Sequence, residues 1–207
     1  YEGVRNCSFR IFTDKRIDRN VTVNLSASGT AAVGTDYTTI PVSFTLTANT
    51  DSLIIPVSVL DDAEIEADES IVLLLQSTDY SKAMLAASPA NAATVTIFDK
   101  PVVTLSQSVN SFAENGGQNT ITVSLNKPWI ADVTVKFGSL ASGTATPVAD
   151  FTFPDSIKIP AGSLTGMVIL TAVNDQLVES DEMVVVEISS VQNGMESGDQ
   201  YLFSVIM

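Results

Sequence analysis

The sequence contains no histidine and a single cysteine, Cys7. Histidine is the usual general base of enzymes and a frequent zinc ligand, so its absence excludes Ser-His-Asp and Cys-His catalysis and most zinc sites. One cysteine cannot form a disulfide within the chain, and we expect a packed, partly buried thiol. Glycine-rich phosphate loops and Gly-x-Ser-x-Gly elbows are also missing, so we expect a protein that is not an enzyme.

Basic residues are scarce as well. Lys and Arg number 10 among 207 residues, Asp and Glu number 24, and the formal net charge is −14. Nucleic acids and anionic membranes are bound through Lys and Arg, so we expect neither as a partner. No apolar run reaches the roughly 18 residues that cross a bilayer, and we expect no membrane insertion of this fragment. We interpret four of the basic residues as a small solvated loop at a hairpin tip: Arg10, Lys15, Arg16 and Arg19.

An internal repeat organises the chain. Residues 28–31, Ser-Gly-Thr-Ala, recur as residues 142–145, and an acidic residue followed by an aromatic one lies seven residues beyond each glycine, at Asp36 and Asp150. Further matches keep the same order along the chain at a nearly constant offset. We therefore predict two homologous units, residues 1–100 and residues 101–207.

Both units carry the pattern of β-structure. Short runs rich in β-branched residues alternate apolar and polar side chains with a period of two, and Gly, Pro and Asn separate them. About seven such strands in a unit of roughly 100 residues predict an all-β fold, in which each unit is an immunoglobulin-like seven-stranded Greek-key β-sandwich. The runs that show the alternation most clearly are residues 21–23, 42–46, 94–97, 121–125 and 133–137.

The two units differ at their starts. Unit 2 opens with a strand-like segment at residues 102–105, whereas nothing equivalent precedes Glu2 in unit 1. We expect unit 1 to lack its initial strand and the chain to be a fragment of a longer protein. Such a unit would leave one sheet edge open to pairing with another chain. Pro101 shortens the linker, and we expect the two sandwiches to stand end to end.

The densest chemical feature is the loop at residues 61–69, Asp-Asp-Ala-Glu-Ile-Glu-Ala-Asp-Glu, which holds six carboxylates and no Lys or Arg. Carboxylates packed together disfavour one another's charged form unless a cation neutralises them. Calcium takes about six to eight oxygen ligands, whereas magnesium prefers fewer protein ligands in a stricter octahedron. The loop therefore favours calcium, and a solvated acidic loop is the alternative. Unit 2 keeps acidic residues at four of the corresponding positions, although the residues around them differ. These four acids are Asp175, Glu179, Asp181 and Glu182.

On these residues each unit resembles a Calx-beta domain, a module of sodium–calcium exchanger regulatory regions, an integrin β subunit and large bacterial surface proteins. The resemblance covers nearly the whole chain. It implies a seven-stranded sandwich that binds calcium at one end through loop carboxylates. The segments that carry it are residues 29–31, 34–37 and 61–69 in unit 1, and residues 143–145, 149–151 and 175–182 in unit 2.

The resemblance also implies a ligand set. For unit 1 the implied calcium ligands are Glu2, Asp36, Asp61, Asp62, Glu66, Glu69 and Asp99. For unit 2 they are Glu114, Asp150, Asp175, Glu179 and Glu182. Asn174 stands where unit 1 has Asp61, and no acid equivalent to Asp99 precedes Met207, so we expect a weaker site in unit 2. We expect one or two ions per site.

The sequence thus predicts a calcium-binding structural or adhesive repeat module of a larger secreted or cell-surface protein of bacterial type, in which calcium stiffens the loops and the interdomain junction. The expected partners are calcium, neighbouring domains of the same protein, and a surface protein or glycan. One alternative is a regulatory calcium sensor attached to a transporter. Another is a carbohydrate- or protein-binding module, in which Trp129 would be a sugar-stacking platform rather than a loop anchor packed on its own sandwich.

Overall fold

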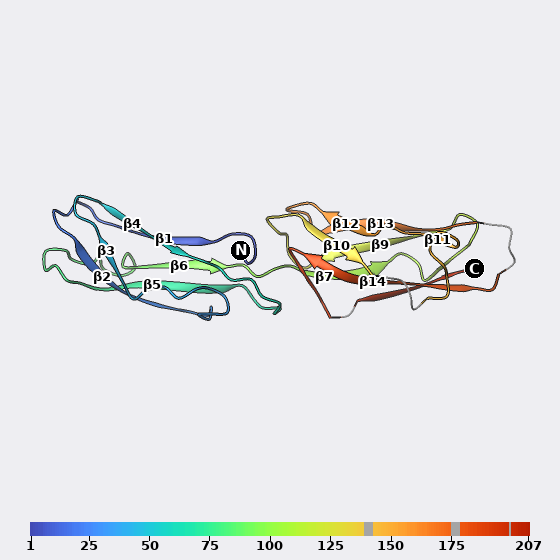
Figure 1. Cartoon of the computed structure of the whole chain (residues 1–207), viewed down its shortest axis with the longest axis horizontal. Helices are drawn as coiled ribbons and strands as arrows, with labels where there is room; N and C mark the ends of the chain where they lie inside the picture. The colour runs from blue at the N-terminus through green and yellow to red at the C-terminus, as the bar shows by residue number, and fades with distance from the viewer. Residues whose placement is uncertain (139–142, 175–178, 199) are drawn as a thin grey trace. The chain divides into compact units, whose positions relative to one another are not determined.

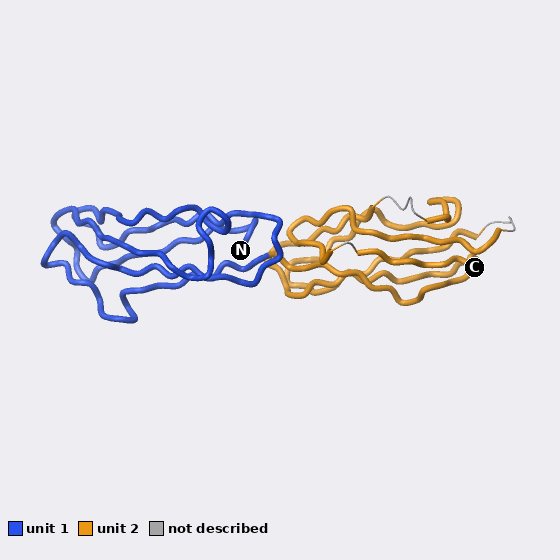
Figure 2. Tube along the Cα trace, turned by 90° about the horizontal axis from the view of Figure 1, so that it is seen from below, with its two compact units in different colours: residues 1–99 blue, residues 100–207 orange. Residues whose placement is uncertain are grey.

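The computed structural model describes residues 1–138, 143–174, 179–198 and 200–207. These residues hold sixteen strands and no helix, so none of them forms a helix able to cross a membrane. The chain divides into two compact units, Tyr1–Asp99 (unit 1) and Lys100–Met207 (unit 2), which Figure 2 distinguishes by colour.

Unit 1 is built from six antiparallel strands in two sheets (Figure 1). One sheet holds β1 and β4, and the other has the order β3-β2-β5-β6. Side chains of alternate residues fill the space between the sheets, among them Phe9, Ile55 and Ile71. The strand bounds are β1 (Cys7–Phe12), β2 (Val21–Gly29), β3 (Ser43–Leu46), β4 (Ser52–Val57), β5 (Glu69–Thr78) and β6 (Ala92–Ile97).

Unit 2 contains two five-stranded sheets, ordered β12-β10-β14-β16-β8 and β11-β13-β9-β7-β15. Within its described part, seven strands have four or more residues and three have two. The longer strands are β7 (Val102–Gln107), β9 (Gln118–Leu125), β10 (Val133–Phe137), β12 (Ser156–Ile159), β13 (Thr165–Ala172), β14 (Glu182–Gln192) and β16 (Tyr201–Ile206). The two-residue strands are β8 (Ser111–Phe112), β11 (Phe151–Thr152) and β15 (Met195–Glu196).

The strands of the two units correspond in order and in register. Phe9 of β1 pairs with Ile55 of β4, and Ile121 of β9 pairs with Val168 of β13 in the equivalent place. Strands β1 to β6 match β9, β10, β12, β13, β14 and β16, whereas β7 has no counterpart among the strands of unit 1. The predicted all-β pair of immunoglobulin-like sandwiches is confirmed.

One sequence interpretation is corrected. Arg10 lies in strand β1, not in a loop with Lys15, Arg16 and Arg19. Its neighbours Phe9 and Ile11 pack on the core while Arg10 is exposed, so the period-two alternation of this strand includes it. Cys7 begins the same strand, half-buried against the core as expected, and burial raises the pKa of its thiol.

Candidate metal centre

The predicted ligands of unit 1 come together because of strand register. β1 begins opposite the end of β4, with Cys7 paired to Val57, and β5 begins opposite the end of β6, with Glu69 paired to Ile97. β2 ends beside the start of β5, with Gly29 next to Ile71. The segments at residues 1–6, 30–42, 58–68 and 98–99 therefore emerge at the same end of the sandwich, although they are far apart in sequence.

Asp36 is fixed by its own loop. The N–H of Ala32 donates to Asp36 Oδ2 at 2.5 Å, and the N–H of Asp36 donates back to the carbonyl of Ala32 at 3.0 Å. Gly34, at φ 92°, supplies the turn between them and donates to the carbonyl of Tyr37 at 2.9 Å. Since Tyr37 is buried in the core, the Asp36 carboxylate is anchored to the body of the sandwich.

Two further buried acids hold the acidic loop in place. The N–H of Asp62 donates to Glu2 Oε1 at 2.8 Å, and the N–H of Glu66 donates to Asp99 Oδ2 at 2.8 Å. Glu2 and Asp99 are both buried and come from segments next to β1 and β6. The backbone N–H of Glu2 also donates to the carbonyl of Phe98 at 3.0 Å. The two ends of the unit thereby position the loop that carries the other acids.

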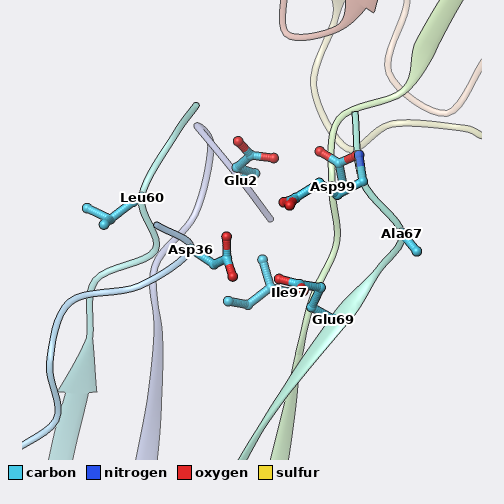
Figure 3. A pocket seen from close by; sticks show the side chains of 8 residues that line it. Glu2, Asp36, Leu60, Ala67, Glu69, Ile97 and Asp99 are labelled. Atoms are coloured by element: carbon cyan, nitrogen blue, oxygen red, sulfur yellow. The ribbon is translucent and has the colours of Figure 1, made fainter. Parts of the chain in front are cut away.

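These acids surround one space. Asp36, Asp62 and Glu66 each offer a carboxylate oxygen, and the three oxygens lie within 4.8 Å of one another. Figure 3 shows the side chains of Glu2, Asp36, Glu69 and Asp99 gathered around the same hollow. In unit 1, which the structure describes in full, the residues that line the hollow include no Lys or Arg: Glu2, Asp36, Leu60, Glu66, Ala67, Glu69, Ile97 and Asp99.

The crowding of negative charge shifts proton affinities. Burial, a side-chain hydrogen bond with Asp36 and the nearby charges raise the pKa of Glu69 to about 7. Burial also raises the pKa of Glu66, and the charges of Asp36, Asp62 and Asp99 add to the effect. Carboxylates held together in this way gain from a cation that neutralises them. The hollow is an array of oxygen ligands suited to a hard divalent ion.

Asp61 has a different position from its neighbour Asp62. It is exposed, and its carboxylate lies beside Gly3, where a Cβ would approach Asp61 Oδ1 to 2.8 Å. It belongs neither to the group formed by Asp36, Asp62 and Glu66 nor to the lining of the hollow. Of the seven acids implied for unit 1, Asp61 is thus the one that belongs to neither set.

Unit 2 repeats the arrangement, and Asp181 is among the acids that line its hollow. Asp150, Glu179 and Glu182 form its group of oxygens within 4.8 Å of one another, and Glu114 lines the same hollow. Burial, a hydrogen bond with Asp150 and the charges of Asp150, Glu179 and Glu114 raise the pKa of Glu182. Asp175, the fifth implied ligand, lies outside the described residues.

The Asp150 loop has hydrogen bonds equivalent to those of the Asp36 loop. The N–H of Thr146 donates to Asp150 Oδ2 at 2.5 Å, and the N–H of Asp150 donates to the carbonyl of Thr146 at 2.9 Å. Val148 donates to the carbonyl of Phe151 at 2.8 Å, as Gly34 does to that of Tyr37. Val148 also keeps the positive φ of the equivalent glycine, at 75°, a conformation that strains a β-branched residue.

Sequence reasoning missed the backbone donors of both sites. The N–H groups of Ala32 and Thr146 orient the two buried aspartates, and those of Asp62 and Glu66 bind Glu2 and Asp99. The equal four-residue separation of donor and aspartate in the two units was the one available signal.

Trp129 is not a sugar platform. Its side chain is only 2% exposed, so neither face of the ring is open to stack on a sugar. The carbonyl of Trp129 accepts the N–H of Gly162 at 2.8 Å, which joins its loop to the turn that precedes β13. The interpretation of Trp129 as a loop anchor is therefore confirmed, and the glycan-binding alternative loses the residue on which it depended.

Comparisons with known proteins give a family and several distant structures. The family described as "Calx-beta domain" matches the chain twice, at residues 2–101 and 99–203. No curated protein matches. A crystal structure of calcium binding domain CBD12 of CALX1.1 is 19% identical, with 92% of this chain and 76% of that chain covered and a TM-score of 0.46. A protein of unknown function from Porphyromonas gingivalis W83 is 11% identical, with coverages of 100% and 93% and a TM-score of 0.32.

Proposed function

This chain belongs to the Calx-beta domain family, as two tandem copies of the domain, and from that premise we propose that each unit binds calcium through the acidic loops at one end of its sandwich. Domains of this family are non-catalytic modules that bind calcium. The observation that carries the proposal is the paired geometry: Asp36 with Asp62 and Glu66 in unit 1, and Asp150 with Glu179 and Glu182 in unit 2. Each unit therefore has a hollow surrounded by carboxylate oxygens, which are ligands that calcium prefers.

The proposed ligands in unit 1 are Glu2, Asp36, Asp62, Glu66, Glu69 and Asp99, and Asp61 adds a negative charge nearby, beside Gly3. In unit 2 they are Glu114, Asp150, Glu179 and Glu182, together with Asp175. Unit 2 binds more weakly, because the uncharged Asn174 stands where unit 1 has Asp61. Fewer charged ligands lower the affinity for calcium.

The biological role of binding is mechanical. Asp99 is buried in the site and is followed directly by Lys100 and Pro101, which lead into β7. Calcium bound to Asp99 fixes the last residue of unit 1 and so stiffens the start of the linker. We place the module in a larger secreted or cell-surface protein, where it spaces or presents adhesive domains. A regulatory sensor of a transporter is the second candidate, and the acidic hollow itself favours neither role over the other.

Thermal unfolding tests calcium binding. A ligand that binds only the folded state stabilises it, by about 2.7 kcal/mol at a hundredfold excess over Kd. We expect millimolar calcium to raise the Tm by several degrees over the value in chelator, and magnesium to raise it less. Glu66→Gln should remove the calcium effect on unit 1. Glu64→Gln is the matched control, since Glu64 lies in the same exposed loop but outside the oxygen group. Equal Tm values in calcium and chelator would contradict the proposal.

A further inference from the structure

The chain contains the pair Asn-Gly twice, at Asn115-Gly116 and at Asn193-Gly194, and both pairs lie in unit 2. In such a pair the backbone nitrogen of the glycine can attack the side-chain carbonyl of the asparagine, because glycine has no Cβ to block the approach. The reaction still requires the two atoms to reach each other. The folded structure therefore decides which of the two pairs reacts.

The first pair lies at the tip of the turn between β8 and β9, where Asn115 and Gly116 are both exposed. The N–H of Glu114 donates to the carbonyl of Met207 at 2.9 Å and holds the start of the turn to the sandwich. A Cβ placed on Gly116 would meet nothing within 4 Å. The tip thus has open space in which its backbone can rotate.

The restraint on the glycine nitrogen of this pair is local. The N–H of Gly116 donates to the carbonyl of Glu114 at 2.6 Å, and the N–H of Gly117 donates to the carbonyl of Ala113 at 3.0 Å. Both bonds join residues of the same short turn. A surface turn that is held by its own hydrogen bonds opens at a small cost in free energy. Opening frees the Gly116 nitrogen to approach the side chain of Asn115.

The second pair is held by the body of the sandwich. Asn193 Nδ2 donates to the carbonyl of Asp132 at 2.8 Å, which fixes the amide that the glycine nitrogen would attack. Gly194 is buried, and a Cβ there would lie 3.1 Å from Val191 Cγ1 and 3.2 Å from the carbonyl oxygen of Pro101. Packing therefore opposes rotation of this backbone, and the same chemical pair is protected.

We propose that Asn115 is a site of spontaneous deamidation, whereas Asn193 is protected by the fold. The Gly116 nitrogen bonds to Cγ of Asn115, and its proton passes through water to the side-chain nitrogen. The bond from Cγ to Nδ2 breaks, ammonia leaves, and a five-membered imide remains. Water then adds to one of the two imide carbonyls and opens the ring. The product is aspartate or isoaspartate, and each carries one new carboxylate.

The new carboxylate lies on the residue next to Glu114, and its consequence for calcium rests on the function proposed above. Glu114, Asp150 and Glu182 line the hollow of unit 2, and a further negative charge beside them increases the attraction for a divalent cation. Because residue 115 is exposed, water and salt screen the added charge. We expect calcium to bind unit 2 about twofold more tightly after deamidation.

Incubation of the full chain in mildly alkaline buffer without calcium tests the site. Samples taken over time are digested, and tandem mass spectrometry assigns each deamidated residue. We expect conversion at Asn115 to be at least about tenfold faster than at Asn193, because the exposed turn opens more often than the packed one. In denaturant the two pairs should convert at similar rates. The proposal is overturned if Asn115 converts no faster than Asn193 in the folded chain, or if the difference persists in denaturant.

Calorimetry of the variant Asn115→Asp tests the consequence for calcium. Asn126→Asp is the matched control, because Asn126 is exposed just beyond the opposite end of β9 and an aspartate can still accept the N–H of Val102. We expect Asn115→Asp to bind calcium in unit 2 about twofold more tightly than the unaltered chain, and Asn126→Asp to bind it equally. Calcium binding that Asn115→Asp does not strengthen overturns the link to the metal site. A chain that binds no calcium contradicts the proposed function instead and leaves the deamidation result as it stands.

Discussion

The carboxyl groups of Glu69 and Asp36 share a hydrogen bond in unit 1, and burial, together with this contact, raises the pKa of Glu69 to about 7. Glu69 is the first residue of β5, whereas Asp36 belongs to the loop after β2. Two carboxylates that are close enough to share a hydrogen bond are stable together only when they share a proton or a cation. The pair therefore links calcium binding to proton release.

The first prediction concerns pH. Because the folded-state pKa of Glu69 exceeds its ordinary value of 4.5, the folded protein holds more protons than the unfolded one between about pH 4.5 and 7. Without calcium, this group makes stability fall as pH rises through that window. Calcium displaces the proton, so its stabilising effect should grow over the same window. Denaturant unfolding at pH 5 and pH 8, with calcium and with chelator, measures both trends. A calcium effect independent of pH would contradict the coupling.

Asp36→Asn separates charge from hydrogen bonding. The amide oxygen of Asn can still accept the N–H of Ala32, so the loop should keep its shape while the site loses a charged ligand. We expect the calcium-induced rise in the Tm of unit 1 to disappear. Asp79→Asn is the matched control, because Asp79 Oδ1 accepts the N–H of Thr22 at 2.9 Å at the opposite end of the sandwich. Loss of the calcium effect in both variants would indicate that the substitutions act through stability alone.

Substitutions at Val148 and Gly34 should change the stability of their units in opposite directions. Val148 is 79% exposed and has φ 75°, so Val148→Gly should stabilise unit 2 by about 0.5 to 1 kcal/mol through relief of backbone strain. Gly34→Val should destabilise unit 1 by about 1 to 2 kcal/mol. A Cβ at Gly34 would meet nothing within 4 Å, which leaves the backbone as the cause. Chemical denaturation measures both, and changes of the same sign would contradict the explanation.

The stiffening role predicts a change in solution dimensions. Calcium bound to Asp99 should fix the start of the linker and narrow the distribution of distances between the units. Small-angle scattering with calcium and with chelator measures this distribution. Asp99→Asn should give the broad distribution under both conditions. Identical scattering profiles of the unaltered chain with and without calcium would contradict the stiffening role.

Period-two alternation and the repeat sufficed to predict the fold, because each sandwich buries alternate residues of every long strand. The acids were predictable as a group since they cluster in loops that antiparallel strands return to one end. The roles of the individual acids were not predictable from the sequence. Asp61 and Asp62 are adjacent in sequence, yet only Asp62 belongs to the group of oxygens formed with Asp36 and Glu66. The N–H of Asp62 donates to Glu2, a contact between distant segments that no local pattern predicts.

Trp129 and Arg10 show the same limit. The sequence favoured a loop anchor for Trp129 over an exposed platform, but only its packing decides between them. Arg10 reads as part of a basic loop until its exposed position between Phe9 and Ile11 in a paired strand is known. In both cases the missing information is tertiary, since the neighbours that decide exposure come from distant parts of the chain.

Isothermal titration calorimetry of the chain with calcium tests the central claim most directly. We predict saturable binding to both units, tighter in unit 1, with a Kd of about 10⁻⁴ to 10⁻³ M if the module is extracellular and a much lower Kd if it is a sensor. Glu66→Gln should remove the tighter binding and leave that of unit 2. Absence of saturable calcium binding by the unaltered chain, or equal binding of magnesium, would contradict the assignment of the acidic loops as calcium sites.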